Sequence, residues 1–502
     1  MPENNNYEEV DIGLQLRNFV SKVLSVLAAA ACVYCLGSTL VRLSADKTRL
    51  IALNFADFEL LLSEHINWLK FNKKTNDFEQ VADPPKRRIQ TLFLLSEKPA
   101  LPQLKGVTHS PVIDHDGKLI CKQPGYDRQS GLFALFNLTD FTPYFWNDSE
   151  LTIDEGKTAI TELANDLLGD FAFLTPLDQS IALSALLTSA LRPVLNAAPM
   201  YMNNANFGTG KSLLSDIFGI FASGSIPPAT SWPGSEDDCR KLLISKLIPF
   251  PPVVFFDNAN GLLRAFNSMC TCLTEPIFED RILGKSEVAA VSTKSLFLVN
   301  GKNARVTEDL ERRTLPVYMA VRSRLNRTFK HHNLRSYAIK NRPRLLMLAL
   351  KSIAAYLQAN DPVKGIPEVP GFDDWDTFCR RTLIFYGYAD PATPILEALA
   401  NRASDCPDQK FAELLVELIG SGTLFGTAEV AILLEGEHGS SLLSFLPPHV
   451  IDASGGVNRR VLGHALAAWS EQADLNGLAI QCTGDAPRCR YVLRRIAQVS
   501  ED

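Results

Sequence analysis

The stretch Ala205-Asn206-Phe207-Gly208-Thr209-Gly210-Lys211-Ser212 decides the fold of this chain. A short apolar run precedes it, which predicts a strand, and the residues after it predict a helix. Strand, glycine-rich loop and helix form a phosphate-binding loop, because backbone N–H groups curl around phosphates and the helix N-terminus adds partial positive charge. The stretch fits this pattern at Gly210, Lys211 and Ser212, whereas Ala205 replaces the first glycine and restricts φ there.

The loop makes ATP and Mg²⁺ the expected cofactors. Lys211 is expected to reach the β- and γ-phosphates, and the Ser212 hydroxyl is expected to hold Mg²⁺. The residues expected to contact the nucleotide follow one another along the loop and into the helix: Asn206, Phe207, Gly208, Thr209, Gly210, Lys211, Ser212 and Leu213.

A second apolar run, Pro251-Pro252-Val253-Val254-Phe255-Phe256, ends in Asp257-Asn258. Four apolar residues that end in Asp predict a buried strand that delivers a carboxylate to its C-terminal edge. Asp257 is therefore predicted to orient Mg²⁺ together with Ser212. The alternative is a core strand that ends in a turn aspartate, but the preceding phosphate-binding loop favours the magnesium site.

A third strand is predicted over Ser292 to Val299, and it ends in the polar tip Asn300-Gly301-Lys302-Asn303. Such a tip is where ATPases of this kind place a sensor for the γ-phosphate or the attacking water. Farther on, Arg312 and Arg313 could present an arginine finger to the γ-phosphate of a neighbouring subunit. Equally, they could form a surface salt-bridge cluster with Asp309 and Glu311, and spacing does not decide between the two.

Arg342 stands before Pro343-Arg344, which predicts the start of an apolar helix over Leu345 to Leu357. An arginine at the start of a lid helix could reach the nucleotide, so Arg342 is a candidate binding residue. The alternative is a solvated first helical turn.

Composition limits the possible classes of protein. The 502 residues are enough for about two to four domains. The net charge of −6 excludes a global basic field, so any nucleic-acid binding must come from local patches. Among the ten cysteines, Cys32 and Cys35 form a lone CxxC without a second pair, which argues against zinc and favours reduced thiols in a cytoplasmic protein.

The segment Val23 to Val41 is mostly apolar and is nearly long enough to span a membrane. Tyr34 and the Leu-Gly-Ser turn that follows argue instead for a helix over Val20 to Ala31 and then a hairpin. No stable membrane association is therefore expected, and a membrane helix is the alternative.

With these pieces placed, the chain resembles the AAA+-type P-loop ATPases of phages and integrative mobile elements, which are often linked to primases and regarded as replicative helicases. The resemblance runs from about Val33 to the C-terminus. Its markers are Val33-Tyr34, Leu40-Val41-Arg42, Leu101-Pro102, Gly106-Val107, Pro111-Val112, Asp116-Gly117, Gly125-Tyr126-Asp127, Gly208 to Ser212, Asp257-Asn258, Asp280-Arg281-Ile282-Leu283-Gly284, Asp309-Leu310, Arg312-Arg313, Arg327, Phe329 and Asp390-Pro391.

The resemblance implies an α/β fold with an αβα P-loop NTPase core. With the patterns along the chain, it gives four expected parts: an N-terminal α+β domain (1–148), the ATPase core with its preceding helices (149–335), a helical lid (336–420) and a winged-helix-like module (421–502). The last part has a basic character from Arg459, Arg460, Arg488, Arg490, Arg494 and Arg495.

The resemblance also implies an ATP-dependent DNA motor, a homo-oligomeric ring such as a hexamer, and single-stranded or forked DNA as the partner. It implies the sensor role for Asn303 and the finger role for Arg312 or Arg313. No primase motif is evident, so a separate primase is a candidate partner. The alternatives are an ATP-binding regulatory or defence scaffold without motor activity, and an inactive relative.

The chain departs from the family at three places. The family's Gly-Asn-Asn tip is Gly301-Lys302-Asn303 in this chain, and Ala205 replaces the first glycine of the loop. Asn258 stands where most AAA+ enzymes carry a glutamate, although an asparagine looks usual in the group of ATPases that this chain resembles. Asn258 can orient water but cannot accept its proton, so the catalytic base is unassigned, and Glu236 is one candidate.

Overall fold

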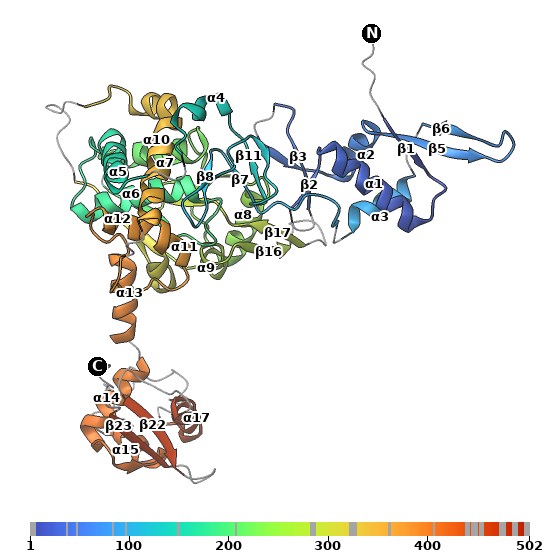
Figure 1. Cartoon of the computed structure of the whole chain (residues 1–502). Coiled ribbons are helices and arrows are strands. Elements are labelled where there is room, and N and C mark those ends of the chain that lie inside the picture. Colours follow the sequence, from blue (N-terminus) through green and yellow to red (C-terminus); the bar gives the residue numbers. More distant parts are fainter. Residues whose placement is uncertain are drawn as a thin grey trace. The chain divides into compact units, whose positions relative to one another are not determined.

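The computed structural model describes most of the chain in two compact units, Met1–Ile395 and Leu396–Asp502 (Figure 1). The described residues are 7–36, 39–46, 49–82, 85–95, 98–147, 151–205, 208–281, 288–320, 329–359, 363–404, 407–436, 442, 450, 456–470, 478–483 and 490–495. The finer division into four parts stays a prediction.

The first unit opens with helices packed on a small sheet. Its elements are β1 (Glu8–Asp11), α1 (Leu16–Ala30), β2 (Tyr34–Leu36), β3 (Thr39–Leu43), β4 (Leu50–Ala52), α2 (Phe55–Ser63), β5 (Ile66–Asn72), β6 (Asp77–Val81) and α3 (Lys86–Leu94). Strands β1, β5 and β6 form one sheet, in which β5 is central. Phe19, Phe58 and Trp68 are buried in the core that joins this sheet to α1, α2 and α3.

The apolar segment Val23 to Val41 does not form one long helix. Helix α1 ends at Ala30, and β2 and β3 then pair antiparallel with Tyr34 opposite Val41, which confirms the predicted hairpin. Among the described residues, no helix is both long and apolar enough to cross a membrane.

Short strands connect this region to the central part of the unit. They are β7 (Gly106–Thr108), β8 (Val112–Ile113), β9 (Leu119–Ile120), β10 (Gly125–Tyr126) and β11 (Leu132–Ala134), followed by α4 (Leu138–Phe141) and η1 (Thr142–Tyr144).

A five-stranded parallel sheet lies at the centre of the unit. Its strands, in spatial order, are β13 (Ala229–Thr230), β14 (Val253–Phe256), β18 (Leu296–Gly301), β12 (Met200–Asn204) and β20 (Thr314–Tyr318). All four neighbouring pairs are parallel, so the carboxyl ends of all five strands share one edge. The α/β class is confirmed. Strand β18 lies between β12, which feeds the glycine-rich loop, and β14, which ends at Asp257.

Helices cover both faces of this sheet. The helices of this part are α5 (Ile153–Leu167), α6 (Pro176–Leu191), α7 (Lys211–Ser223), α8 (Glu236–Leu247), α9 (Asn267–Thr274) and α10 (Leu334–Gln358). Met200 and Met202 of β12 pack in one cluster with residues of α8 and α9. Tyr201 points to the opposite face, where its hydroxyl lies 2.7 Å from Thr188 Oγ1 of α6. Because side chains alternate along a strand, the sheet lies between two helical layers.

Smaller elements surround the sheet and continue the chain. They are β15 (Leu262–Leu263), β16 (Ile277–Arg281), β17 (Val288–Ser292), β19 (Arg305–Val306), η2 (Glu308–Arg313), α11 (Asp373–Trp375), the π-helical segment η4 (Asp376–Arg380) and α12 (Arg381–Phe385). Helix α13 (Thr393–Ser404) continues past the boundary between the units.

Helix α10 is longer than predicted. It begins at Leu334, where the Asn333 side chain accepts a hydrogen bond from the Ser336 backbone, and Pro343 lies inside it. The helix packs side by side with α5 (Figure 1). A proline inside a helix removes a backbone hydrogen bond, so the sequence alone predicts a helix start at Pro343. In the structure, packing against α5 outweighs this local cost, and the helix continues through Pro343.

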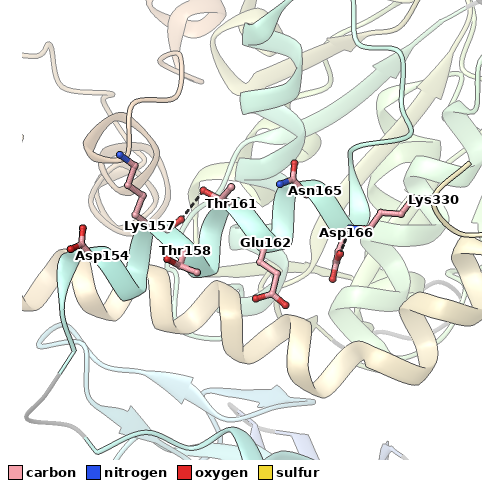
Figure 2. Close-up of a pocket in the computed structure, with 8 residues that line it drawn as sticks. All are labelled: Asp154, Lys157, Thr158, Thr161, Glu162, Asn165, Asp166 and Lys330. Carbon is pink, nitrogen blue, oxygen red and sulfur yellow. Dashed lines mark hydrogen bonds and ion pairs between the residues drawn. The ribbon is translucent and has the colours of Figure 1, made fainter.

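A cluster of charged side chains joins α5 to α10. Asp166 of α5 accepts hydrogen bonds from Lys330, from Arg344 and from the Tyr337 hydroxyl, the last at 2.8 Å. Figure 2 shows Asp166 beside Lys330 at the end of a polar groove along α5. Burial alone would raise the pKa of Asp166, but these hydrogen bonds outweigh it and lower that pKa to about 2.

This cluster predicts an acid-sensitive contribution to stability. Since the folded-state pKa of Asp166 lies below the usual 3.8, its contribution is complete above about pH 4 and is lost as the pH falls toward 2. We expect Asp166→Asn to cost about 2 kcal/mol at pH 7, and less as the pH falls through that window. Urea unfolding of both proteins at several pH values measures this. Asp154→Asn, on the same groove, is the control, and a difference that does not change with pH contradicts the prediction.

The second unit contains a small helical bundle against a three-stranded sheet. Its remaining described elements are α14 (Pro407–Ile419), β21 (Leu424–Phe425), α15 (Thr427–Glu435), α17 (Arg459–Ser470), β22 (Leu478–Thr483) and β23 (Arg490–Arg495). Strand β23 is central and pairs antiparallel with both neighbours. Phe411, Val430, Leu462 and Tyr491 lie in its buried core. Of the predicted basic residues, Arg488 lies outside the described residues.

Candidate functional site

The glycine-rich loop connects β12 to α7 at the carboxyl edge of the sheet. Gly208 and Gly210 have φ angles of 82° and 102°, which explains the need for glycine at both positions. Ala205 does not adopt a positive φ, and its N–H donates to the Gly301 carbonyl at 3.3 Å. The replacement of the first glycine by alanine is therefore compatible with the loop. Asn206 and Phe207 lie outside the described residues.

Helix α7 begins differently from its neighbours. Thr152, Thr175 and Ser235 cap α5, α6 and α8 with their side-chain oxygens. Within α7, whose residues are all described, no side chain caps the N-terminus at Gly210 and the first turn carries no acidic residue. Such an N-terminus favours an anion, because its first N–H groups have no partner within the helix and the helix dipole places partial positive charge there.

Lys211 is the first residue of α7. Its ammonium group donates to the carbonyls of Ala205 and Gly301, at 3.4 and 3.2 Å. Burial lowers the pKa of Lys211, Asp257 opposes this, and the charge of Lys302 lowers the pKa further. The structure therefore brings Lys211, Asp257 and the turn after β18 together. Thr209 is buried and Leu213 is partly buried beside Lys211.

Asp257 directly follows β14, as predicted. Its N–H donates to the Thr230 carbonyl at 2.9 Å, and its Oδ1 accepts a hydrogen bond from the Asn258 N–H at 2.9 Å. Asn258 has a φ of 57°, so the chain turns sharply at this point. Asp257 is partly buried and Ser212 is exposed.

The oxygen donors of Asp257 and Ser212 are the type that Mg²⁺ prefers, and Mg²⁺ commonly keeps waters and phosphate oxygens as its other ligands. These residues therefore fit the expected ion. Among the described residues, no group of three or more His, Cys, Asp or Glu side chains is arranged to hold a metal by itself. No disulfide links the described cysteines either.

The turn after β18 is anchored on two sides by asparagine side chains. Asn204, at the end of β12, donates to the Ala304 carbonyl at 2.7 Å and accepts from the Ala304 N–H at 3.2 Å. Asn260, in the loop after Asp257, accepts from the Lys302 N–H at 2.7 Å. Asn303 stands between these contacts with a φ of 51°, and its side chain is exposed. The predicted sensor turn is thus tied to both the loop strand and the Asp257 segment.

A buried polar triad lies beneath the loop. Ser215 of α7 donates to Asn300 Oδ1 at 2.6 Å, and the Asn203 side-chain amide donates to Ser215 Oγ at 2.7 Å. All three side chains are fully buried, and Asn203 Oδ1 and Asn300 Nδ2 have no hydrogen-bond partner in the described part of the chain. This triad and the anchors Asn204 and Asn260 were not predicted from the sequence. The available signal was the pair of asparagines that ends an otherwise apolar strand.

Arg312 and Arg313 lie at the opposite edge of the sheet. They end η2 just before β20, whose first residue, Thr314, pairs with Met200 at the amino end of β12. The loop follows the other end of β12, about 13 Å away at about 3.3 Å per residue. Within one chain, the structure does not bring these arginines to Lys211.

Asp309 holds both arginines. Arg312 forms an ion pair with its carboxylate at 3.1 Å, and the Arg313 guanidinium donates to its backbone carbonyl at 2.7 Å. The Arg312 side chain is 37% exposed and the Arg313 side chain is 15% exposed. The predicted contact with Asp309 is present, and Arg312 is the more accessible of the two residues.

Arg342 lies far from the loop. Its guanidinium donates to the carbonyls of Phe221, Ala222 and His109, each at 3.0 Å. Phe221 and Ala222 are near the C-terminal end of α7, about 15 Å along the helix from Lys211. The structure therefore places Arg342 as a buried cap of α7 and does not bring it to the nucleotide loop.

We expect Arg342→Ala to destabilise the protein by about 2–4 kcal/mol, because three buried carbonyls lose their donor. Chemical unfolding measures this loss, and Arg342→Lys, which keeps the charge but loses the fork of donors, is the matched comparison. Nucleotide affinity of the folded fraction should stay unchanged. Weaker nucleotide binding by an Arg342 variant with unchanged stability would instead support the predicted contact between Arg342 and the nucleotide.

Glu236 is not placed as a catalytic base. Its two carboxylate oxygens accept hydrogen bonds from the backbone N–H groups of Asn267 and Ser268, at 2.8 and 3.0 Å. It therefore caps α9.

Comparison with known proteins gives no assignment. No protein-family model matches this chain, and no curated protein matches it either. Among solved structures, it is similar to the NrS-1 C-terminal region (305–718) in an A-form apo structure, with 12% identity, a TM-score of 0.35, and coverage of 94% of this chain and 98% of that chain. A second A-form apo structure of that region has 13% identity and a TM-score of 0.34, and covers 87% and 97%. Neither likeness supports a conclusion about fold or function, because both TM-scores are low.

Proposed function

We propose that this chain is an ATPase with a P-loop NTPase core. The observation that carries this proposal is the convergence of three segments at one edge of the parallel sheet. The Lys211 ammonium lies at the start of α7, 3.2 Å from the Gly301 carbonyl, and Asp257 is close enough to act on its charge. A cation, a helix N-terminus and a carboxylate in this arrangement suit a nucleotide phosphate chain with its magnesium ion.

The residues of the site divide the work between binding and hydrolysis. The N–H groups of the loop and α7 would hold the β-phosphate, and Lys211 would neutralise the β- and γ-phosphates. Asp257 and the Ser212 hydroxyl would hold Mg²⁺, which would supply positive charge to the phosphate chain. Asn303, on its anchored turn, would orient the attacking water.

Proton removal from that water is the weak step of this site. Asn258 cannot accept a proton, and both oxygens of Glu236 already accept hydrogen bonds from α9. We therefore expect slow basal hydrolysis that increases when another subunit completes the site.

The finer proposal is a DNA motor of the mobile-element replicative helicase type. In such a motor, subunits form a ring, one subunit's Arg312 or Arg313 completes the neighbour's site, and hydrolysis moves loops that grip single-stranded DNA. The position of both arginines at the sheet edge opposite the loop supports a role between subunits, because neither can reach Lys211 within its own chain. The second unit would then act as a winged-helix-like module.

ATP turnover by the purified full-length protein, with and without single-stranded DNA, tests the proposal. Strong stimulation together with displacement of a strand from a forked substrate supports a motor. Turnover without DNA stimulation or strand displacement favours the ATP-binding regulatory or defence scaffold. Failure to bind ATP at all contradicts the proposed core.

A further inference from the structure

The hairpin of β5 and β6 extends past the helices that pack on its base (Figure 1). At the base, Trp68 of β5 is buried and stacks on Phe19 of α1, with 5.8 Å between the ring centroids. From residue 70 to residue 80, every residue is exposed except Asn72, which is partly buried. These eleven positions, which we call the hairpin tip, therefore lie outside the core of the unit.

Two phenylalanines contact each other on the hairpin tip. Phe71 and Phe78 are cross-strand partners whose ring centroids lie 5.3 Å apart, and they are 43% and 47% exposed. Such a pair also stabilises a hairpin. However, single apolar side chains scattered over a surface are ordinary, whereas neighbouring ones that form a joint patch indicate contact with a ligand. The exposed surface is aromatic, so it suits a ligand with flat π-faces.

The acidic side chains of β6 lie on the other face of the hairpin. Asp77 and Glu79 are each one residue away from Phe78, and side chains alternate between the two faces along a strand. On that other face, Glu79 is the cross-strand partner of Lys70 and accepts a hydrogen bond from the Asn72 side chain at 2.6 Å. The face with the rings receives only uncharged side chains from β5 and β6: Asn67, Leu69, Phe71, Phe78 and Gln80.

The turn between the two strands is basic. Lys73 and Lys74 are consecutive and exposed, and the turn, residues 73–76, contains no acid. The N–H of Lys74 donates to Asn72 Oδ1 at 2.9 Å, and Asn76 has a φ of 56°, so the backbone of the turn has a defined shape. Two ammonium groups therefore follow Phe71 within three residues.

Exposed aromatic rings next to lysines match the chemistry of single-stranded nucleic acid. The unpaired bases of a single strand stack on aromatic side chains, and cations neutralise its phosphates. A duplex offers the same phosphates, but its bases are stacked on one another, so the rings would gain no contact with them. An apolar protein surface would cover the rings but would leave the lysines without an opposite charge.

We propose that the hairpin tip binds single-stranded DNA, in which Phe71 and Phe78 stack on bases and Lys73 and Lys74 contact phosphates. The site belongs to the N-terminal sheet, whereas the proposed ATPase site belongs to the five-stranded sheet. It therefore goes beyond the proposed function, from which only the choice of DNA over RNA is taken.

Fluorescence anisotropy of a labelled oligothymidylate tests the role of the rings, with purified full-length protein and no ATP. We expect Phe71→Leu and Phe78→Leu, made together, to weaken binding about tenfold, because leucine keeps an apolar cross-strand contact but offers no π-face. A strand of equal length that lacks bases should bind more weakly than oligothymidylate to the wild type, and equally to the wild type and this double variant. Thermal unfolding should be unchanged.

The lysines are tested by the salt dependence of the same binding. Lys73→Gln and Lys74→Gln, made together, should weaken binding of both strands. They should also lower the slope of log affinity against log salt by about 1.4, because each phosphate contact with a single strand contributes about 0.7. Lys241→Gln, which removes an exposed lysine of α8, is the control and should leave affinity and slope unchanged.

Each outcome supports the site or refutes it. Unchanged binding of oligothymidylate by the phenylalanine double variant refutes it. An equal loss for the strand without bases also refutes it, because the rings would then serve only the hairpin itself. Tighter binding of an RNA strand of matching sequence refutes the choice of DNA, and self-association that depends on the rings without an effect on DNA assigns the patch to protein contact instead.

The site and the proposed function can fail separately. A protein that hydrolyses no ATP but shows the expected pattern with both double variants keeps the DNA site and loses the proposed ATPase. A protein that hydrolyses ATP and binds DNA equally well with both double variants keeps the ATPase and loses the DNA site on the hairpin tip.

Discussion

Lys211→Ala protein is expected to lose ATP hydrolysis by about a thousandfold or more, because the charge that develops on the transferring phosphoryl group is no longer neutralised by the Lys211 ammonium. The fold should survive. The hydrogen bonds of the Lys211 ammonium go to the carbonyls of Ala205 and Gly301, and Lys211 is only partly buried, so water can replace it. Phosphate release measures the first expectation, and thermal unfolding measures the second.

Two further variants make this test specific. Asp257→Ala should also remove hydrolysis while leaving the fold intact, since the carboxylate is only partly buried and accepts a hydrogen bond from the N–H of the next residue, Asn258. Lys241→Ala removes an exposed lysine of α8 that pairs with Asp237, and it should hydrolyse ATP at the wild-type rate. Full turnover by purified Lys211→Ala protein overturns the assignment of the whole site.

The strands and the loop of this site were predictable because their signals are local. An apolar run before a glycine-rich loop predicts β12, and an apolar run that ends in Asp257 predicts β14, whatever the rest of the chain does. The αL conformations of Gly208 and Gly210 follow from the same short stretch. Local pattern also separated α1 from the hairpin after it, against the hydropathy of the whole segment.

The contacts that organise the site depend on neighbours distant in sequence. Asn204 bonds to Ala304 only because β12 and β18 are adjacent in the sheet, and nothing near Asn204 in the sequence indicates that adjacency. Glu236 likewise caps α9, which is distant from it in the sequence. The prediction for Arg342 failed for a different reason, because a local sequence signal was present but misleading. Pro343 is a strong local signal for a helix start, but packing against α5 extends α10 back to Leu334 and turns Arg342 toward the end of α7.

The second large effect concerns a site shared between subunits. The structure places Arg312 and Arg313 away from the loop of their own chain, so a contact with the γ-phosphate requires a neighbouring subunit. Loss of an arginine finger costs about a thousandfold or more in turnover, because charge on the γ-phosphate in the transition state is left uncompensated. ATP binding should change far less, since Lys211 and the loop hold the ground state.

Arg312→Ala is the first variant to make. Its side chain is the more exposed of the pair, whereas the Arg313 guanidinium bonds to the backbone of η2, so Arg313→Ala is expected to lower stability as well. Arg313→Ala should still be measured beside it, because either arginine could move when subunits meet. Unfolding curves separate a loss of turnover from a loss of folded protein.

Mixing the inactive variants then tests whether the finger acts between subunits. Lys211→Ala protein carries intact arginines, and Arg312→Ala protein carries an intact loop. In a randomly mixed ring, about a quarter of the head-to-tail interfaces pair an intact loop with an intact arginine. We therefore expect mixing, under conditions where subunits exchange, to restore part of the wild-type turnover that neither variant has alone. If Arg312→Ala and Arg313→Ala each hydrolyse ATP normally as pure samples, the finger hypothesis is wrong, and the pair serves only to hold η2 through Asp309.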